Sequence, residues 1–370
     1  MIKISKDTGK NGNLTAGLDW LQFQIDMKID TIITDVLGLD GDLFIEKSGN
    51  LKYYDYEKYW IYGEIKLYYT KKSDTPSMVQ FSGSGWAFYK DNYLDTWEVT
   101  EFGYIKFLDN SFGRLIEPKR LDMRLDDFND KPYYTPKTLL NYCQKRRLLY
   151  GRSTIYKPFG DDFTGRTLYL GADDSTKKTR IYDKLVEQAK KIGIRPKDLA
   201  EDMRINSWIR TETEFRQDDV KAIWLEIIKT EHNELEFYKG YLKGKIKFLD
   251  KGGKPYHPEF WRHFMLKTTA WSYKIVKKQT PILDKINWFM NKGALPILKM
   301  YQFRYDNEIT TAPLDQYPID WLIEEARYSK ALATEIIKYL AELNDLSEDK
   351  KMDLIEQVQR QTKDTNSLFD

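Results

Sequence analysis

The sequence from Arg120 to Asp126 reads Arg-Leu-Asp-Met-Arg-Leu-Asp, with charged and apolar residues in strict alternation. Successive side chains of a β-strand point to opposite faces of the sheet, so this period of two predicts a strand with one apolar and one charged face. The segment from Ile209 to Arg216 repeats the pattern. Two such strands side by side would gather up to four carboxylates, ringed by arginines, on one face, while their apolar face would belong to the core.

Shorter segments of the same kind surround these two strands. Alternation at 19–25, 60–69 and 78–81 predicts further strands, and 166–171 with 178–182 predicts a hairpin. Gly83 and Gly85 favour a strand-ending turn over a phosphate-binding loop. The other predicted elements are a strand at 102–107 and helices at 31–39, 91–100, 135–147, 184–193, 217–248, 258–277, 281–291, 317–343 and 347–361.

This order of elements predicts an α+β fold, in which an antiparallel sheet is followed by a mostly helical C-terminal region. We expect four parts along the chain. Residues 1–110 would form an N-terminal α+β part, and 111–235 a sheet region with the acidic strands and a candidate tyrosine. Residues 236–310 would form a basic DNA-recognition region, and 311–370 an acidic helical tail.

Composition narrows the class of protein. The chain has 370 residues, of which 41% are hydrophobic and 15% aromatic, enough for a sizeable core. Cys143 is the only cysteine and there are three histidines, which excludes a disulfide framework and Cys-rich zinc sites; we expect Cys143 to be a small buried hydrophobe. No apolar run approaches the roughly 20 residues of a membrane helix, and no signal peptide is visible. We therefore expect a soluble, cytoplasmic protein that does not contact membranes.

The net charge of +2 hides a strong asymmetry along the chain. Lys239 to Arg304 holds 15 Lys and Arg but only three Asp and Glu, whereas Asp320 to Asp370 holds seven bases and 12 acids. Such a basic stretch favours a polyanionic partner, and its interleaved aromatics could stack on unpaired bases, although we expect most of them to be core residues. The predicted DNA contacts are Lys243, Lys245, Lys247, Lys251, Lys254, Arg262, Lys267, Lys274, Lys277 and Lys278.

Asp122, Asp126, Glu212 and Glu214 are the carboxylates of the two charged strands. Carboxylates gathered on one face repel each other unless a cation or the arginines neutralise them, and Mg²⁺ or Mn²⁺ takes oxygen ligands. Two interpretations follow, a divalent metal site or a solvent-exposed cross-strand ladder of salt bridges. The residues alone leave both open.

Tyr182 stands between Arg180 and Lys184, where the predicted hairpin ends and a helix begins. An ordinary phenol has a pKa near 10 and is a poor nucleophile at neutral pH, but these two cations would favour its phenolate and could hold a phosphate. The alternative is that Tyr182, one of 26 tyrosines, is a packing residue.

Taken together, these segments resemble the Rep_trans family, which comprises rolling-circle plasmid replication initiators of the staphylococcal type and related relaxases of integrative and conjugative elements. The resemblance covers roughly residues 15–275. It is carried by Leu-Asp-Met-Arg-Leu-Asp-Asp-Phe (121–128), Thr-Leu-Tyr-Leu-Gly (167–171), Arg-Ile-Tyr-Asp-Lys (180–184) and Arg-Thr-Glu-Thr-Glu-Phe (210–215), together with Leu-Asp-Trp-Leu (18–21) and Phe-Ser-Gly-Ser-Gly (81–85).

The resemblance implies a sheet related to tyrosine endonuclease and relaxase folds, and a DNA strand transferase that nicks one strand at an origin and keeps the 5′ end as a phosphotyrosine. Tyr182 matches the nucleophile position. Asp122 or Asp126, with Glu212 and Glu214, match the positions expected to hold a catalytic Mg²⁺ or Mn²⁺. The chain lacks the His-hydrophobic-His metal pair of the larger tyrosine endonuclease class, so these carboxylates would replace it.

Further expectations concern the neighbours and partners of this site. Arg180 and Lys184 would offset charge growing on the phosphoryl oxygens. The expected partners are a double-stranded origin, single-stranded DNA, a second copy of the chain in a homodimer, and a host helicase.

Two other classes of protein use the same residues. A non-enzymatic, sequence-specific DNA-binding protein would keep the basic region without the chemistry, and a hydrolytic metal-dependent nuclease would use the acids to activate water in place of Tyr182. Whether the chain is a plasmid initiator or a conjugative relaxase is not decided by these residues.

Overall fold

The structure, a computed structural model, describes residues 13–49, 56–70, 75–161, 164–266, 268–273, 330–342 and 347–361. The chain divides into two compact units, residues 1–275 and 276–370. Within the described part of the second unit lie helices α13 (Lys330–Glu342) and α14 (Glu348–Arg360). None of the helices in the described ranges is long and apolar enough to cross a membrane. The finer division into four parts stays a prediction.

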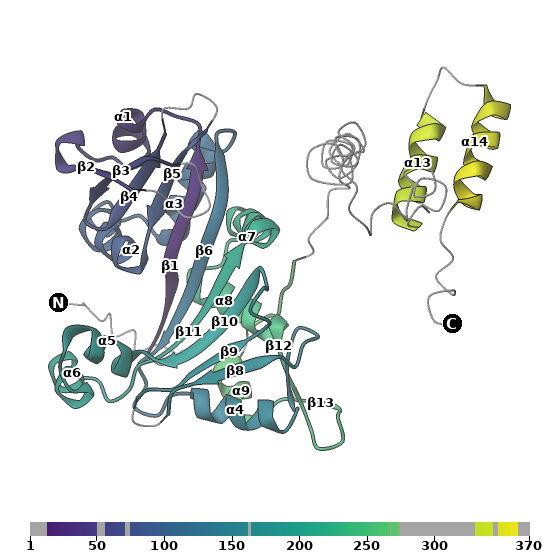
Figure 1. The fold of residues 1–370 in the computed structure, drawn as a ribbon. Coiled ribbons are helices and arrows are strands. Elements are labelled where there is room, and N and C mark those ends of the chain that lie inside the picture. Colours follow the sequence, from purple (N-terminus) through teal and green to yellow (C-terminus); the bar gives the residue numbers. More distant parts are fainter. Residues whose placement is uncertain are drawn as a thin grey trace, which may run out of the picture. The chain divides into compact units, whose positions relative to one another are not determined.

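The described residues of the first unit build a ten-stranded antiparallel sheet in the order β2-β3-β4-β5-β1-β6-β11-β10-β9-β8 (Figure 1). The long strands β1 and β6 lie side by side in its middle, and β8 forms one edge. The strands are β1 (Leu14–Ile25), β2 (Ile45–Ser48), β3 (Lys58–Tyr62), β4 (Ile65–Tyr69), β5 (Ser77–Phe81), β6 (Ile116–Asp127), β8 (Tyr156–Phe159), β9 (Thr167–Leu170), β10 (Lys177–Asp183) and β11 (Ile209–Arg216). The predicted α+β class is confirmed.

The alternation of the two charged strands gives this sheet one apolar and one polar face. Leu121, Met123 and Leu125 of β6 are buried in the main core, which also holds residues of the helices that pack on the sheet. Cys143 lies in this core, as predicted. The helices concerned are α3 (Glu101–Phe112), α4 (Pro136–Gln144), α7 (Gln217–Lys229), α8 (Glu234–Lys245) and α9 (Glu259–Met265).

The N-terminal part differs from the sequence prediction at three places. Residues 60–69 are two strands, β3 and β4, because Gly63 and Glu64 both adopt positive φ and form a two-residue hairpin turn. The predicted strand 102–107 is part of helix α3, whose start is capped by the Thr100 hydroxyl accepting the Gly103 N–H. The predicted turn around Gly83 is the start of helix α2 (Gly83–Tyr89).

Short helical segments complete this part of the chain. The predicted helix 31–39 is α1 (Ile29–Thr31) continued by η1 (Ile32–Val36), and the chain leaves it at Gly38 with φ +64°. A 3-10 turn, η2 (Gly41–Leu43), precedes β2, and η3 (Lys90–Leu94) extends α2 into the region predicted as helix 91–100.

The C-terminal third of the first unit is less helical than predicted. The predicted helix 217–248 is divided into α7 and α8, with Asn233 capping the second, and a small sheet β13-β12-β7 follows. The predicted helix 258–277 ends at Met265, after which Trp271 packs back on α8 and donates its indole N–H to the Phe237 carbonyl at 2.7 Å. The new strands are β7 (Leu148–Tyr150), β12 (Ile246–Leu249) and β13 (Pro255–Tyr256). The predicted helix 281–291 lies outside the described residues.

Candidate functional site

Three neighbouring strands bring the predicted site residues together on the polar face of the sheet. In the register of β10 with β11, Arg180 lies opposite Glu212, and Tyr182 follows two residues later on the same face. Strand β11 pairs in turn with β6, which sets Glu214 opposite Asp122. The cross-strand patch expected from the two alternating sequences is therefore confirmed.

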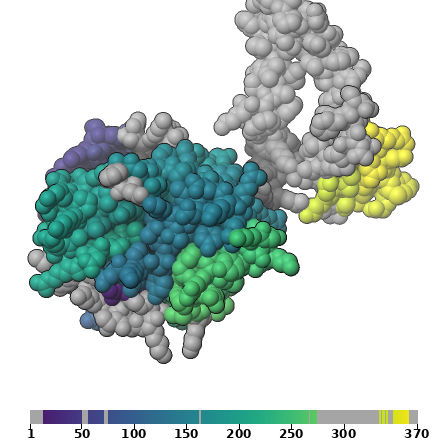
Figure 2. Space-filling model, turned by 90° about the horizontal axis from the view of Figure 1, so that it is seen from below, coloured from purple at the N-terminus to yellow at the C-terminus, as the bar shows by residue number. Residues whose placement is uncertain are grey.

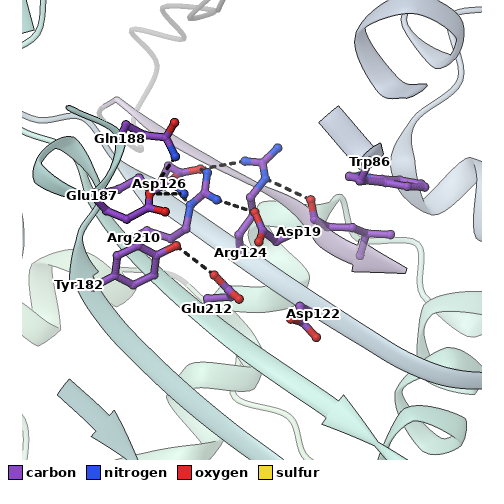
Figure 3. A network of polar contacts seen from close by, with 12 residues as sticks. Asp19, Trp86, Asp122, Arg124, Asp126, Tyr182, Glu187, Gln188, Arg210 and Glu212 are labelled. Carbon is purple, nitrogen blue, oxygen red and sulfur yellow. Dashed lines mark hydrogen bonds and ion pairs between the residues drawn. The ribbon is translucent and has the colours of Figure 1, made fainter. Parts of the chain in front are cut away.

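The Tyr182 phenol lies beside Glu212 (Figure 3). Its hydroxyl donates to Glu212 Oε2 at 3.1 Å, and Arg180 Nη2 lies 2.5 Å from the other oxygen of the same carboxylate. Burial, and next the Glu212 charge, raise the pKa of the Tyr182 phenol well above its ordinary value, while Arg210 and Arg180 act in the opposite direction. A pKa raised in this way favours the neutral phenol, and its hydroxyl is directed at the Glu212 carboxylate.

Arg210 lies directly opposite Tyr182 in the strand register and is buried. Its Nε and Nη2 donate to the two oxygens of Asp126 at 2.7 and 2.9 Å, and its Nη1 donates to Asp19 at 2.5 Å. Trp208 Nε1 donates to Asp126 as well, at 2.6 Å. Burial would raise the pKa of Asp126, but Arg210 and then Arg124 outweigh it and hold that pKa below its ordinary value. Asp126 is thus an ionised clamp that fixes Arg210 beside the phenol.

Asp19 is a site residue whose role the alternation alone did not reveal. The pairing of β1 with β6 shifts register between Leu18 and Trp20, so Asp19 is an extra residue at a bulge. Bulges re-aim side chains, and this one brings the Asp19 carboxylate to Arg210. The sequence showed Asp19 at the start of an alternating segment, but it gave no signal for the bulge.

Asp122 and Glu214 form a second charged group on the same face. Arg120 holds Asp122 with Nε at 2.8 Å and Nη2 at 2.5 Å, and the same Nη2 lies 2.9 Å from Glu214. Arg216 Nε reaches Glu214 from the other side at 2.9 Å. The pKa of Asp122 is raised to about 7, chiefly by burial and further by the charges of Glu212 and Glu214, against the opposing effect of Arg120. The salt bridges of the alternative interpretation are present, but the expected solvent exposure is wrong, because Asp122 is buried and Arg120 and Glu214 are half-buried.

Helix α5 (Lys184–Ile192) closes one end of the site. The Asp183 carboxylate caps it by accepting the Val186 N–H at 3.1 Å, which explains why the strand ends one residue after Tyr182. The Lys184 ammonium is buried, lies 2.7 Å from Glu187 and 5.6 Å from the centre of the Tyr182 ring. Burial and then Arg210 lower the pKa of Lys184.

Two protein-family models match this chain. The family model Rep_trans, described as replication initiation factor, matches residues 117–312, and the N-terminal domain of rolling circle replication initiation proteins matches residues 15–108. The chain belongs to the Rep_trans family. Family membership implies a DNA-binding protein.

One solved structure supports the fold of this Rep_trans chain. The rolling circle replication initiator protein from Geobacillus stearothermophilus matches with a TM-score of 0.55 at 22% identity, over 72% of this chain and 100% of the other. No curated protein sequence matches. This likeness, with the antiparallel sheet and its helices, supports the predicted α+β fold.

A cleft of about 960 Å³ runs along the polar face of the Rep_trans protein in front of Tyr182. It extends from α5 across β10, β11 and β6 to β1 and α2. Besides the residues above, its lining includes Trp20, Ser84, Trp86, Lys90, Glu101, Arg124, Tyr169, Gln188, Lys191 and Trp208. A second, smaller cavity of about 180 Å³ adjoins Arg180 and Glu212 and shares Tyr169 with the cleft.

The carboxylates predicted as metal ligands differ in their contacts with arginine, and those of Asp122, Asp126 and Glu212 differ in the direction of their pKa shifts. Both oxygens of Asp126 are held by Arg210 and both oxygens of Asp122 by Arg120. The pKa of Asp126 is lowered, whereas the pKa values of Asp122 and Glu212 are raised, chiefly by burial and further by neighbouring carboxylates. Among the described residues no three acidic, His or Cys side chains converge to hold an ion by themselves. Mg²⁺ commonly uses one or two carboxylates plus substrate phosphates, so the donor chemistry of Glu212 and Asp122 fits.

The basic region of the Rep_trans protein separates into exposed and half-buried lysines. Lys247, Lys251, Lys254 and Arg262 are exposed on β12, the turn to β13, and α9, at a surface seen in green in Figure 2. By contrast, Lys243 and Lys245 are half-buried, and Lys243 Nζ lies 2.6 Å from the Thr268 carbonyl. Lys267, Lys274, Lys277 and Lys278 lie outside the described residues.

The aromatics of this region behave as expected from the sequence. Tyr241, Phe248 and Trp261 are buried in the main core, whereas Tyr256 on β13 is exposed. The predicted contribution of the exposed basic side chains to DNA binding stays a prediction.

Proposed function

We propose that this Rep_trans protein is an origin-specific DNA nicking and strand-transfer enzyme that uses Tyr182 as its nucleophile. The observation that supports this most is the hydrogen bond from the Tyr182 phenol to Glu212, beside a cleft that is lined by Tyr182, Arg180 and Arg210. A phenol needs a nearby base and positive charge to attack a phosphodiester, and these three neighbours supply both.

The proposed reaction is a transesterification. The Tyr182 proton passes to Glu212 Oε2, and the phenolate oxygen forms a bond to the scissile phosphorus. The bond from phosphorus to the 3′ oxygen breaks, and that oxygen leaves with the electron pair and takes a proton from solvent water to become a 3′ hydroxyl. The 5′ phosphate stays on Tyr182. Attack of a 3′ hydroxyl on this phosphotyrosine reverses the step and rejoins the strand.

The arginines have separate tasks in this scheme. Arg210 is fixed by Asp126 and Asp19, so its charge is preorganised beside the phenol and costs little reorganisation during the reaction. Arg180 is part-exposed and lines the cleft, which allows it to offset charge on the phosphoryl oxygens. Lys184 is held by Glu187 at the end of the cleft and adds positive charge there.

The test is adduct formation on labelled single-stranded oligonucleotides drawn from candidate origins and a mixed library. We expect a slow-migrating protein–DNA species on a denaturing gel with the wild type and none with Tyr182→Phe. Tyr169→Phe removes a phenol one strand away on the same face and should leave the adduct intact. Cleavage without an adduct would indicate a hydrolytic nuclease, and binding without cleavage a non-enzymatic DNA-binding protein.

A divalent cation is the proposed cofactor. Glu212 and Asp122 are the ligands we favour, and the ion, when bound, would polarise the scissile phosphate. The raised pKa values of Asp122 and Glu212 mean that their negative charges are unfavourable in the folded protein. A bound cation would offset these charges, so it should stabilise the fold at pH 8. We expect Mg²⁺ or Mn²⁺ to raise the Tm of the wild type but not that of Asp122→Asn combined with Glu212→Gln. An equal rise in both proteins would place the ion elsewhere.

Homodimerisation and recruitment of a host helicase belong to the same proposal and are supported by family resemblance. The proposal covers both plasmid initiators and conjugative relaxases. Sedimentation of the full chain with and without origin DNA would test the dimer.

A further inference from the structure

Two aromatic side chains stand at the edge of the sheet beside the proposed nucleophile. Phe159 is in the edge strand β8 and is 49% exposed, and Tyr169 is half-buried in the next strand, β9. Their ring centres lie 5.6 Å apart in an edge-to-face contact with an angle of 82° between the planes. The contact fixes the two rings against each other and leaves much of Phe159 open to solvent.

Strand register places these rings on the same face as Tyr182. Thr167 of β9 lies opposite Tyr182 and, on its other side, opposite Phe159. Two inter-strand spacings, about 10 Å, therefore separate the backbones of Phe159 and Tyr182. Tyr169 lies opposite Arg180 and borders both the cleft and the smaller cavity beside Glu212. The aromatic pair is thus continuous with the proposed site.

Each ring has a cation beside it. Lys157 Nζ lies 5.2 Å from the centre of the Phe159 ring, and Lys178 Nζ lies 5.9 Å from the centre of the Tyr169 ring. Asp173 contacts both lysines, at 3.2 and 3.7 Å, so the two lysines together outweigh its single negative charge. This combination of open aromatic surface and positive charge is what unpaired nucleotides bind.

Protection of the sheet edge does not explain the exposed phenylalanine. Edge strands are commonly blunted by lysine and proline, and β8 already has Lys157 and Pro158. An exposed apolar ring at the next position would work against that protection, because apolar edges invite pairing with other chains. Phe159 therefore needs another reason to be at the surface.

We propose that Phe159 and Tyr169 form a stacking platform for an unpaired base of single-stranded DNA next to the scissile phosphate. The inference rests on the proposed function, since it names the state of the substrate at that site. The platform holds one nucleotide flanking the cleavage position out of a duplex stack, and Lys157 and Lys178 hold the adjoining phosphates. Stacking tolerates any base, so the platform contributes affinity and position rather than origin sequence.

The test uses full-length Tyr182→Phe protein, which keeps the DNA uncleaved, and mixed-sequence single-stranded oligonucleotides with 2-aminopurine at successive positions. Stacking quenches 2-aminopurine, so we expect a position at which fluorescence falls on binding. In Phe159→Leu combined with Tyr169→Leu the quench should disappear, and the affinity should fall by about 5- to 100-fold. Tyr169→Phe should retain both.

Matched variants separate stacking from simple loss of fold or charge. Phe107→Ala removes an equally exposed phenylalanine, 43% exposed on α3, and should change neither quench nor affinity. Lys157→Gln should reduce the salt dependence of binding, whereas the leucine variant should leave it unchanged. An unaltered quench in the leucine variant, with normal thermal unfolding, would overturn the platform.

The outcome is independent of that of the adduct assay. If the wild type forms the covalent adduct but the leucine variant keeps quench and affinity, the platform is wrong and the proposed function stands. If the leucine variant loses both while no adduct forms with any DNA, single-strand stacking stands and nicking by Tyr182 is wrong.

Discussion

Asp19 reaches Arg210 across 191 residues of sequence, and its charge also acts on Glu212. Burial is the main cause of the raised pKa of Glu212, and Asp19 is the next. If Glu212 accepts the Tyr182 proton, nicking needs the ionised carboxylate and its rate rises with pH through the Glu212 pKa. Removing the Asp19 charge lowers that pKa, so Asp19→Asn should shift the acid limb of the rate profile to lower pH.

The same substitution loosens Arg210, so we also expect the maximal rate to fall about 10- to 100-fold, the range typical for loss of an electrostatic or positioning contact. The measurement is single-turnover adduct formation between pH 5 and 9. Asp202→Asn, at an exposed position of α6 (Pro196–Met203), is the control and should change neither quantity. A lower rate with an unmoved acid limb would mean that Asp19 acts only through the fold.

Asp122 gives a prediction about stability. Its pKa is about 7 in the folded protein but near 4 in an unfolded chain, so between these values the folded state alone keeps the proton. Stability from this group is therefore present below pH 4 and is lost as pH rises to about 7. The unfolding free energy of the wild type, relative to Asp122→Asn, should fall by about 2 to 3 kcal/mol from pH 5 to pH 8. Urea unfolding at the two pH values measures this, and a constant difference would contradict it.

The core-facing side of strand β11 helps to fix the register that aligns the residues on its polar face. Thr213 lies between the two glutamates of that strand and points to the core, where its hydroxyl meets Thr179 at 2.6 Å and Tyr238 at 2.7 Å. The Thr179–Thr213 pair is directly adjacent in register to the Arg180–Glu212 pair. These buried hydroxyls therefore help to fix the strand alignment on which the site depends.

Thr213→Val keeps the shape and removes the hydroxyl, which leaves the Tyr238 hydroxyl without this partner. We expect a loss of about 1 to 3 kcal/mol in unfolding free energy, and most of it should return in Thr213→Ser. Thr34→Val, where the hydroxyl is exposed and water can replace its bonds, should change stability by less than about 0.5 kcal/mol. Equal losses of unfolding free energy at both positions would show that the buried hydroxyl network stabilises the fold no more than an exposed hydroxyl does.

Alternation of apolar and polar residues predicted the strands well, because it reflects burial of one face of the sheet. It failed where a segment fits both the strand period of two and the helical period of 3.6. Phe102, Ile105 and Leu108 are buried at helical spacing, yet Phe102 and Tyr104 also fit a strand, and the Thr100 cap decides for the helix. Likewise the end of α9 depends on Trp271 returning to α8, where Gly240 leaves room for its ring. Such long-range packing is not visible in a local pattern.

For the whole molecule, the sequence could predict which residues share a face but not how they pair. The two charged strands identified the carboxylates and arginines that share a face, and the family resemblance added Tyr182; the strand register confirms that all of them lie on one face. The position of β1 next to β6, and the bulge that brings in Asp19, follow from tertiary pairing between distant segments. The sequence likewise gave no indication that Phe159 of β8 lies near Tyr182, because this follows from the register of β8, β9 and β10.

The basic region contains both exposed and half-buried lysines, and only an exposed lysine can contact a DNA phosphate directly. Lys247, Lys251 and Lys254 are exposed around the β12–β13 turn, whereas Lys243 is half-buried with its ammonium on the Thr268 carbonyl. Each phosphate contact contributes about 0.9 to the slope of log affinity against log salt on duplex DNA. Replacing the three exposed lysines by Gln should therefore reduce that slope by up to about 3.

Lys243→Gln is the matched control, because it removes the same unit of charge from the same region and should leave the slope nearly unchanged. The measurement is binding of full-length protein to duplex DNA at several salt concentrations. Long-range attraction would make every lysine equivalent per charge, whereas direct contact separates the exposed lysines from the buried one. A slope that falls equally per charge in both proteins would mean that this surface attracts DNA without touching it.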